Sequence, residues 1–245
     1  MSKDLWAGLS GILSAGAAAM GSGRAEIQSR TVRAGGDAFT YQLHVPARLE
    51  GPPPVLVFLH GINQRGAGGY LPTRGAPGAV VGGYLGRVPA AVLLPQCRPG
   101  SYWSDPVMDE MVMRALEEAS AEIGADSARL YLAGVSMGGY GVWHLASEHP
   151  GRFAALVSVC GGSPLRAGER FAPVAEKVGR TPAWLFHGAD DRVVPPSESR
   201  QMAAAIEAAG GDVRYSEYPG VGHNVWTKVL AEKRLMPWLL AQRRG

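Results

Sequence analysis

One stretch constrains the fold of this chain more than any other. An apolar run ends in a Gly-x-Ser-x-Gly pattern and passes directly into a helical pattern, reading LYLAGVSMGG from Leu130 to Gly139. Such a run predicts a strand joined without a linker to a helix, with Ser136 on the sharp turn between them. Glycines fit at positions 134 and 138, because a β-carbon there would collide with the neighbouring backbone. The stretch therefore predicts a nucleophile elbow, although the short pattern alone is common in Gly-rich chains.

Short apolar runs alternate with helical patterns along the rest of the chain. Runs that are continuously apolar indicate parallel strands covered on both faces. Residues 26–32 and 39–45 flank Ala34-Gly35-Gly36-Asp37 and predict an N-terminal antiparallel hairpin. We therefore expect an α/β fold with a mostly parallel sheet of about eight strands and helices on both faces. The further expected strands are 55–59, 90–94, 130–133, 154–159, 183–186 and 213–218, and the expected helices are 106–123, 137–149, 197–209 and 225–242, the last kinked or restarted at Pro237.

Length and charge exclude several classes of partner. The 245 residues suit one α/β domain, which we place at 25–245, after an N-terminal segment at 1–24. A net charge of +3 with scattered basic residues gives no support for nucleic acid as a partner. No apolar run approaches the ~20 residues of a membrane span. Residues 5–20 resemble a signal peptide, but Asp4 cancels Lys3 and Gly and Ser interrupt the run, so a cytoplasmic location is favoured over secretion.

The two cysteines do not indicate a disulfide or a compartment. Cys97 and Cys160 follow different expected strands. On the expected sheet they are about three strand spacings of ~4.8 Å apart, which exceeds the reach of a disulfide. We therefore expect two free thiols in the core.

A serine nucleophile needs a general base, and the base needs a third group that orients it. After Ser136 the chain offers carboxylates in His187-Gly188-Ala189-Asp190-Asp191, and then His223 in a Gly-rich loop after the last expected strand. Serine, acid and histidine in this order are expected for an elbow on such a sheet. All three follow strands, whose carboxyl ends meet at one edge of the sheet. We predict Ser136 as nucleophile, Asp191 as acid, with Asp190 as the alternative, and His223 as base.

Oxyanion stabilisation requires two preorganised N–H groups. The backbone N–H of Met137, next to the nucleophile at the start of a helix, is the first expected donor. The second is expected from the loop after the strand at 55–59, where Ile62 is preferred and Gly61 and Asn63 are alternatives. His60 is expected to be a hydrogen-bonding scaffold residue rather than a second base.

Only about twenty residues separate Gly162 from Pro182, which is too few for a cap domain over the active site. We therefore expect an open, shallow site. The Gly-rich loop at 64–86 and the pair Tyr102-Trp103 are the expected rim. Trp226 is a further rim candidate, with packing as its alternative role.

On these motifs the chain resembles the α/β-hydrolase superfamily, in particular its cap-less carboxylesterase branch with dienelactone-hydrolase-like, feruloyl-esterase-like and "predicted peptidase" members. The resemblance runs from about Val55 to near the C-terminus. It implies an α/β-hydrolase fold, a Ser136–His223–Asp191 triad, no metal or cofactor, and a small-molecule or polymer-linked ester as substrate. Ile62-Asn63-Gln64 departs from the small residue and glycine that usually follow His-Gly. The matching stretches are Phe58–Gly61, Leu94–Cys97, Gly134–Gly141, Val159–Gly162, His187–Asp191 and Gly220–His223.

Other functions remain as alternatives. A serine peptidase of the prolyl-oligopeptidase-like type would share the triad, but such relatives usually carry a gating domain. A non-catalytic binding module would be expected to lack part of the triad. A metal site from His187, Asp191 and His223 lacks a tight ligand spacing. A dinucleotide-binding enzyme is disfavoured because no G-x-G-x-x-G follows the first strand. The sequence does not indicate an oligomeric state.

Overall fold

The computed structural model describes residues 26–46, 51–68, 88–165 and 169–245. The N-terminal segment 1–24 and most of the loop at 64–86 lie outside the described residues, so the expectations for them stay predictions. Among the described residues, no helix is both long enough and apolar enough to cross a membrane.

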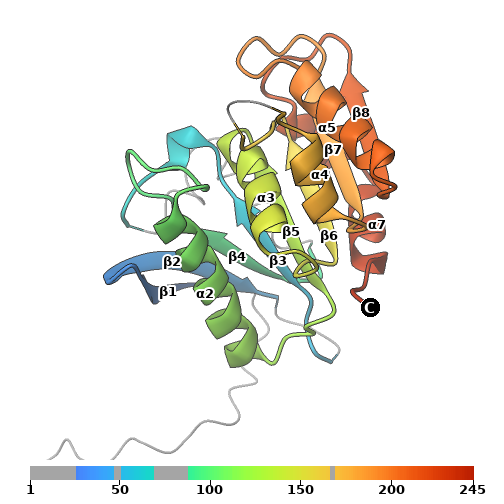
Figure 1. The fold of residues 1–245 in the computed structure, drawn as a ribbon. Coiled ribbons are helices and arrows are strands. Elements are labelled where there is room, and N and C mark those ends of the chain that lie inside the picture. Colours follow the sequence, from blue (N-terminus) through green and yellow to red (C-terminus); the bar gives the residue numbers. More distant parts are fainter. Residues whose placement is uncertain (1–25, 47–50, 69–87, 166–168) are drawn as a thin grey trace, which may run out of the picture.

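The described strands form one sheet in the order β1-β2-β4-β3-β5-β6-β7-β8 (Figure 1). β1 and β2 form the expected antiparallel hairpin, and β2 also pairs antiparallel with β4. All later pairings are parallel. The expected mostly parallel, eight-stranded architecture is confirmed. The strands are β1 (Glu26–Ala34), β2 (Asp37–Val45), β3 (Val55–Leu59), β4 (Ala91–Pro95), β5 (Leu130–Val135), β6 (Ala155–Val159), β7 (Ala183–Gly188) and β8 (Val213–Tyr218).

Helices cover both faces of the sheet. α2 (Pro106–Ile123), α3 (Met137–Glu148), α4 (Ala172–Val178) and α5 (Ser197–Ala208) lie on one face (Figure 1). α6 (Trp226–Ala231) and α7 (Leu235–Ala241) pack against the other face, and η1 (Ile62–Gln64) is a short 3₁₀ turn after β3. The expected helix at 225–242 is therefore two helices, and α4 was not predicted. Pro237 lies in the first turn of α7, where its missing N–H costs no intrahelical bond.

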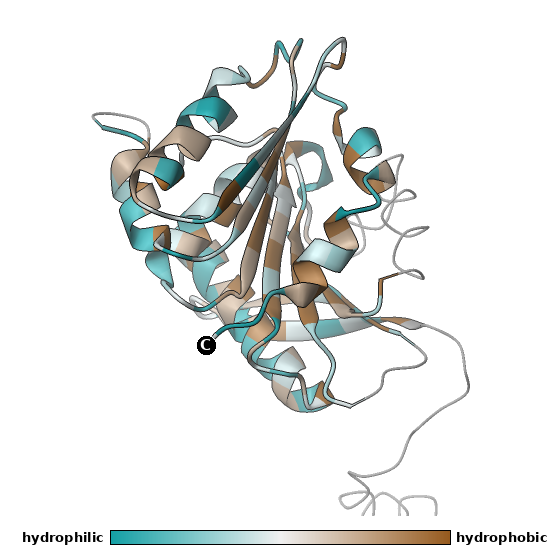
Figure 2. Cartoon of the chain, turned by 90° about the vertical axis from the view of Figure 1, so that its right-hand side faces the viewer, coloured by the Kyte–Doolittle hydropathy of each residue, from teal (hydrophilic) through white to brown (hydrophobic). Residues whose placement is uncertain are grey.

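Both faces of the central strands are buried, as their continuously apolar sequences predict. On β3, Val57 and Leu59 pack in the core under α2 and α3. Leu56 and Phe58 face the opposite side, toward α6 and α7. In Figure 2 the hydrophobic strands lie between helices on both sides. This double cover holds the carboxyl ends of β3, β5, β6, β7 and β8 rigidly at one edge of the sheet, where the loops that follow them carry polar side chains.

The two cysteines lie at that edge but do not meet. Cys97 follows β4 and Cys160 follows β6, with β3 and β5 between those strands in the sheet. Both are buried free thiols, which confirms the expectation from the sequence.

Candidate active site

Ser136 occupies a strained turn between β5 and α3. Its backbone φ of 55° and ψ of −118° lie in a region that residues other than glycine rarely adopt. A β-carbon on Gly134 would lie 2.2 Å from the carbonyl oxygen of Gly138. One on Gly138 would lie 2.0 Å from the carbonyl oxygen of Leu59. Both glycines are therefore required by close backbone approach, and the expected elbow is confirmed as a geometry.

A chain of two hydrogen bonds connects the serine to a carboxylate. The Oγ of Ser136 lies 2.9 Å from the Nε2 of His223, and the Nδ1 of His223 lies 2.7 Å from the Oδ2 of Asp191. The Asp191 side chain is fully buried, whereas the His223 side chain is 25% exposed. The structure thus brings together the three side chains that the sequence singled out, across 87 residues of chain. Asp190, the alternative acid, is exposed.

The environment of Asp191 keeps its carboxylate ionised. Burial alone would raise its pKa, but hydrogen bonds from His223 and from the backbone N–H groups of Val194 and Val193 outweigh burial and lower the pKa. The two N–H groups donate to Oδ1 at 3.0 and 2.8 Å, which leaves Oδ2 directed at the imidazole. An ionised, oriented acid can stabilise the imidazolium that forms when His223 takes a proton.

His187, which has no exposed surface, holds the turn that presents the acid. Its Nε2 lies 3.0 Å from the carbonyl oxygen of Val194 and 3.2 Å from the Oδ2 of Asp191. Its Nδ1 lies 2.7 Å from the hydroxyl of Ser199 on α5. Because the carbonyl can only accept, Nε2 carries the proton and Nδ1 accepts from the serine. Burial lowers the pKa of His187, so the ring stays neutral in this role.

His60 plays a comparable role in the loop after β3, which carries the second expected oxyanion donor. Its Nδ1 lies 2.7 Å from the carbonyl oxygen of Gly61, and the backbone N–H of Cys97 donates to its Nε2 at 3.0 Å. The partners fix the tautomer, with the proton on Nδ1. Burial lowers the pKa of His60 to about 4. The expected scaffold role is therefore consistent with its contacts.

This contact also orients the peptide that carries the N–H of Ile62. In a planar trans peptide the carbonyl of one residue and the N–H of the next point in opposite directions. Because His60 holds the Gly61 carbonyl, the Ile62 N–H points away from the histidine ring. A β-carbon on Gly61 would lie 3.6 Å from the Cβ of Ser136, so this peptide lies beside the nucleophile.

Ile62 and Met137 each begin a helical turn, η1 and α3, so their N–H groups have no acceptor within that turn. These are the two donors that the sequence preferred, and their roles stay a prediction.

A cavity of about 540 Å³ opens beside Ser136, a size typical of small-molecule sites. Trp103 lines the cavity, but it is buried and its indole N–H donates to the carbonyl of His60 at 3.0 Å, so it forms a wall rather than a rim. Tyr102 lines the same cavity and is 40% exposed.

Of the two roles expected for Trp226, its contacts fit packing. Trp226 is the first residue of α6 and packs against the core on the α6 and α7 side of the sheet. It is absent from the described lining of the cavity. A tryptophan early in an amphipathic helix was given two roles by the sequence, and here its large apolar surface is used in packing.

One cluster of metal-ligand types occurs within the described residues. Cys160, Asp191 and His223 present ligand atoms that all lie within 4.8 Å of one another, and His187 is not part of the cluster. Burial raises the pKa of the Cys160 thiol to about 12, so the thiol is protonated in the metal-free protein. Asp191 and His223 already bond to each other, and this contact uses them as members of the hydrogen-bonded series from Ser136.

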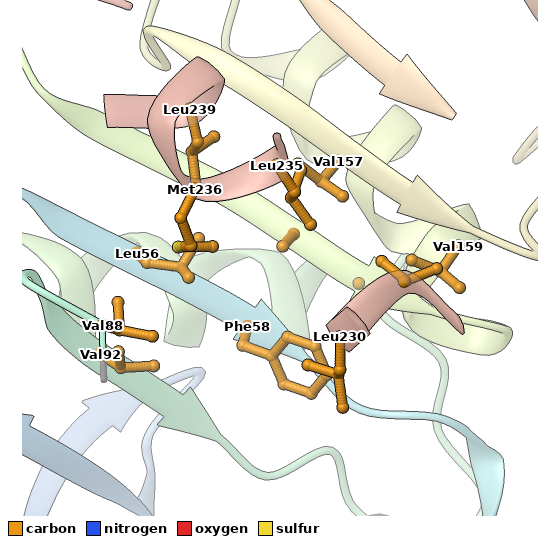
Figure 3. A pocket seen from close by; sticks show the side chains of 13 residues that line it. Leu56, Phe58, Val88, Val92, Val157, Val159, Leu230, Leu235, Met236 and Leu239 are labelled. Carbon is orange, nitrogen blue, oxygen red and sulfur yellow. The ribbon is translucent and has the colours of Figure 1, made fainter. Parts of the chain in front are cut away.

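A second cavity, of about 80 Å³, lies on the opposite face of the sheet (Figure 3). Its described lining is apolar throughout and comes from β3, β4, β5, β6, α6 and α7. Phe58, Leu230 and Met236 are among the side chains that face it (Figure 3). It offers no group that could act as acid, base or nucleophile, so the chemistry belongs to the cavity at Ser136.

Sequence reasoning missed several polar residues of that cavity. Tyr140, Ser163 and Arg170 line it with Ser136. Tyr140 follows Ser136 by four residues on α3, so helical periodicity places it on the same face as the nucleophile. Ser163 and Arg170 lie between Gly162 and Pro182, a segment in which the sequence pointed to no functional residue.

The fold and the elbow define an α/β-hydrolase. The chain belongs to the phospholipase/carboxylesterase family, whose model matches residues 105–234. It is similar to the carboxylesterase SOBER1 of Arabidopsis thaliana, with 23% identity over 146 residues that cover 57% of this chain and 63% of that protein.

Solved structures agree with this assignment. A thermostable esterase superposes with a TM-score of 0.78 and 33% identity, covering 89% of this chain and 63% of the esterase. The acylaminoacyl peptidase of Pyrococcus horikoshii superposes with a TM-score of 0.72 at 16% identity, covering 90% of this chain and 42% of the peptidase, which shows the shared fold alone. The chain thus spans less than two thirds of the length of these relatives.

Proposed function

We propose that this chain is a serine hydrolase that cleaves carboxylic esters through an acyl-enzyme on Ser136. The observation that carries the proposal is the hydrogen-bonded series from Ser136 through His223 to the buried Asp191. Family membership and the similarity to esterases support the same reaction. We also propose that residues 25–245 act as one catalytic domain, because one continuous sheet carries every element of the site.

The reaction proceeds in two acyl-transfer steps. The Oγ of Ser136 attacks the ester carbonyl while the Nε2 of His223 takes its proton, and the carbonyl oxygen becomes an oxyanion that the N–H groups of Met137 and Ile62 stabilise. The tetrahedral intermediate collapses, and His223 gives its proton to the departing alcohol. Water then attacks the acyl-enzyme with His223 as base, which releases the acid and restores Ser136.

The cavity supports esters with short to medium acyl groups. Its walls combine apolar and aromatic side chains, including Ile62, Trp103 and Leu165, with a volume of about 540 Å³. Leu165 is 40% exposed at its edge. Such a site accepts either a small free ester or an acyl group attached to a polymer. A screen of p-nitrophenyl esters from acetate to laurate, run beside an acetylated polysaccharide, distinguishes these two substrates.

The central test compares two serines of one helix region. Ser136→Ala is expected to abolish ester hydrolysis and labelling by a fluorophosphonate. Ser147→Ala is the matched control, because Ser147 lies on α3 away from the cavity and donates to the carbonyl of His144. Equal activity in the two variants, both folded by circular dichroism, refutes the proposal. Peptide anilides are assayed in parallel, and turnover of anilides above that of esters favours the peptidase alternative.

A further inference from the structure

One end of the active-site cavity carries a polar cluster that the triad does not use. Arg170, which precedes α4, and Ser163, which follows β6, both line the cavity. Glu198 in the first turn of α5 is only 12% exposed and accepts two hydrogen bonds from the Nη2 of Arg170, at 2.9 and 2.7 Å. It also accepts one from the N–H of Ser163 at 3.2 Å. A β-carbon on Gly162 would lie 2.3 Å from Glu198 Oε2, so glycine at this position leaves the room that the carboxylate occupies.

Most of the donors in this cluster are already used. The Nε of Arg170 donates to the carbonyl of Leu165 at 3.0 Å, and the hydroxyl of Ser163 donates to the carbonyl of Arg170. Two donors differ. Within the described part of the chain, no hydrogen bond uses the Nη1 of Arg170 or the hydroxyl of Tyr140, and both residues line the cavity. By contrast, the hydroxyl of Tyr131 donates to a backbone carbonyl at 3.0 Å.

The Tyr140 hydroxyl is a neutral donor close to the nucleophile. Tyr140 lies one helical turn after Ser136, and side chains on a helix lean toward its N-terminus, where Ser136 is located. Burial raises the pKa of Tyr140, and the charge of Glu198 raises it further. The phenol therefore stays protonated and offers its O–H.

The charge of the cluster selects the chemistry of its acceptor. The guanidinium of Arg170 is offset by the carboxylate of Glu198 at 2.7 Å. A substrate carboxylate would therefore meet no net positive charge and would lose its hydration on entry. A neutral oxygen atom of the substrate, by contrast, needs only one hydrogen-bond donor in the cavity. The acyl group becomes bonded to Ser136 at the start of the helix that carries Tyr140, whereas the alcohol leaves past His223.

We propose that Tyr140 selects esters whose acyl group carries a neutral oxygen acceptor, such as an ether, carbonyl or hydroxyl oxygen, with the Nη1 of Arg170 as the neighbouring donor. This specificity rests on the proposed ester hydrolysis at Ser136. It adds a recognition site to a cavity whose other walls are mainly apolar.

The test uses substrates that differ by one atom. p-Nitrophenyl hexanoate is compared with analogues in which an ether oxygen replaces the methylene at C3, C4 or C5. The wild-type protein is expected to favour at least one ether analogue over hexanoate in kcat/KM. In Tyr140→Phe, which removes only the hydroxyl, that ratio is expected to fall about fivefold, the value of one net hydrogen bond. Tyr131→Phe, which removes a tyrosine hydroxyl that donates to the carbonyl of Gln242 and does not line the described cavity, is expected to leave the ratio unchanged.

Each contrary outcome has a definite meaning. An unchanged ratio in a folded Tyr140→Phe variant overturns the specificity proposal, as does a wild-type preference for hexanoate over all three ether analogues. A wild-type preference for the p-nitrophenyl monoester of glutaric acid, which carries a carboxylate, overturns the choice of a neutral acceptor. If the wild-type protein shows no ester hydrolysis that depends on Ser136, the proposed function itself fails, and this outcome is distinct from the other three.

Discussion

His60 provides the sharpest test of how the oxyanion loop is held. Its Nδ1–H is bonded to the carbonyl of Gly61 at 2.7 Å and so directs the N–H of Ile62 away from the ring, beside Ser136. Replacing His60 by Gln places an amide near the former Nε2 and leaves the Gly61 carbonyl with only the N–H of Gln64, at 3.2 Å, as its donor. Replacing it by Asn places an amide near Nδ1 and retains that donor. Comparing the two variants separates the effect of the orienting hydrogen bond from the effect of the rest of the His60 side chain.

The expected loss follows from the number of donors affected. In His60→Gln only the N–H of Gln64 restrains the Gly61–Ile62 peptide, and when the peptide turns, one of two oxyanion donors is lost while that of Met137 remains. Removal of one such donor costs about 10²–10³ in kcat, or roughly 2.7–4 kcal/mol of transition-state stabilisation. KM should change little, because the oxyanion exists only after Ser136 attacks. We therefore expect this loss in His60→Gln and substantial recovery in His60→Asn.

The assay is steady-state kinetics with p-nitrophenyl butyrate, combined with binding of a boronic acid that forms a tetrahedral adduct on Ser136. Boronate affinity should fall together with kcat. Trp103→Phe removes the indole donor to the His60 carbonyl and reduces the ring that packs edge-on against His60 at 4.9 Å, but it leaves both hydrogen bonds of the imidazole in place. It should therefore lower the melting temperature while reducing kcat far less than His60→Gln does. Equal kcat values for folded Gln and Asn variants would falsify the orienting role of His60.

Three further outcomes follow from the site. Asp191→Asn should lower kcat about 10⁴-fold, because an amide cannot hold His223 in the required tautomer. Near-normal hydrolysis of p-nitrophenyl butyrate by this variant would contradict the role of Asp191 in the triad. Gly138→Ala should lower the free energy of unfolding in urea by more than about 2 kcal/mol, because its β-carbon would lie 2.0 Å from the Leu59 carbonyl oxygen, and a neutral effect would disprove that close approach. Burial lowers the pKa of His60 from 6.5 to about 4, so between these pH values the unfolded chain binds a proton that the folded chain does not. The contribution of His60 to the free energy of unfolding, about 3 kcal/mol, is therefore fully present above pH 6.5 and is lost as the pH falls to 4. In denaturant titrations His60→Asn should show a shallower slope over this range than the wild-type protein, because it lacks the contribution of His60 and retains that of His187.

The parts of the site that the sequence predicted are those whose determinants are local. The elbow requires only a strand, two glycines and a helix start, all within ten residues around Ser136. Asp191 and His223 follow strands in a parallel sheet, so their meeting at one edge follows from topology. The β3 and β8 boundaries were also predicted correctly, because Gly, Pro and polar residues bound those strands sharply.

The parts that were missed depend on contacts between distant segments. No periodicity in the sequence pairs Arg170 with Glu198, which lie 28 residues apart on separate elements. Trp226 was given two possible roles, and only the packing of α6 against the sheet decided between them. Likewise, the N–H of Cys97 lies 37 residues from the His60 ring that accepts it, so the tautomer of His60 is visible only in the folded chain.

Two His-Gly pairs, each where a strand ends, share one physical design. In each, a buried neutral histidine donates from one ring nitrogen to a backbone carbonyl and accepts at the other, so that His60 holds the oxyanion loop and His187 holds the acid loop. Burial lowers the pKa of both rings, which keeps them neutral where His223 must gain and lose a proton. His60 should therefore contribute no protonation to the acid limb of kcat/KM above about pH 4. If the acid limb of the wild-type protein contains a protonation above that pH that is missing in His60→Asn, the ring of His60 titrates in that range, and its neutrality is not what fixes the loop.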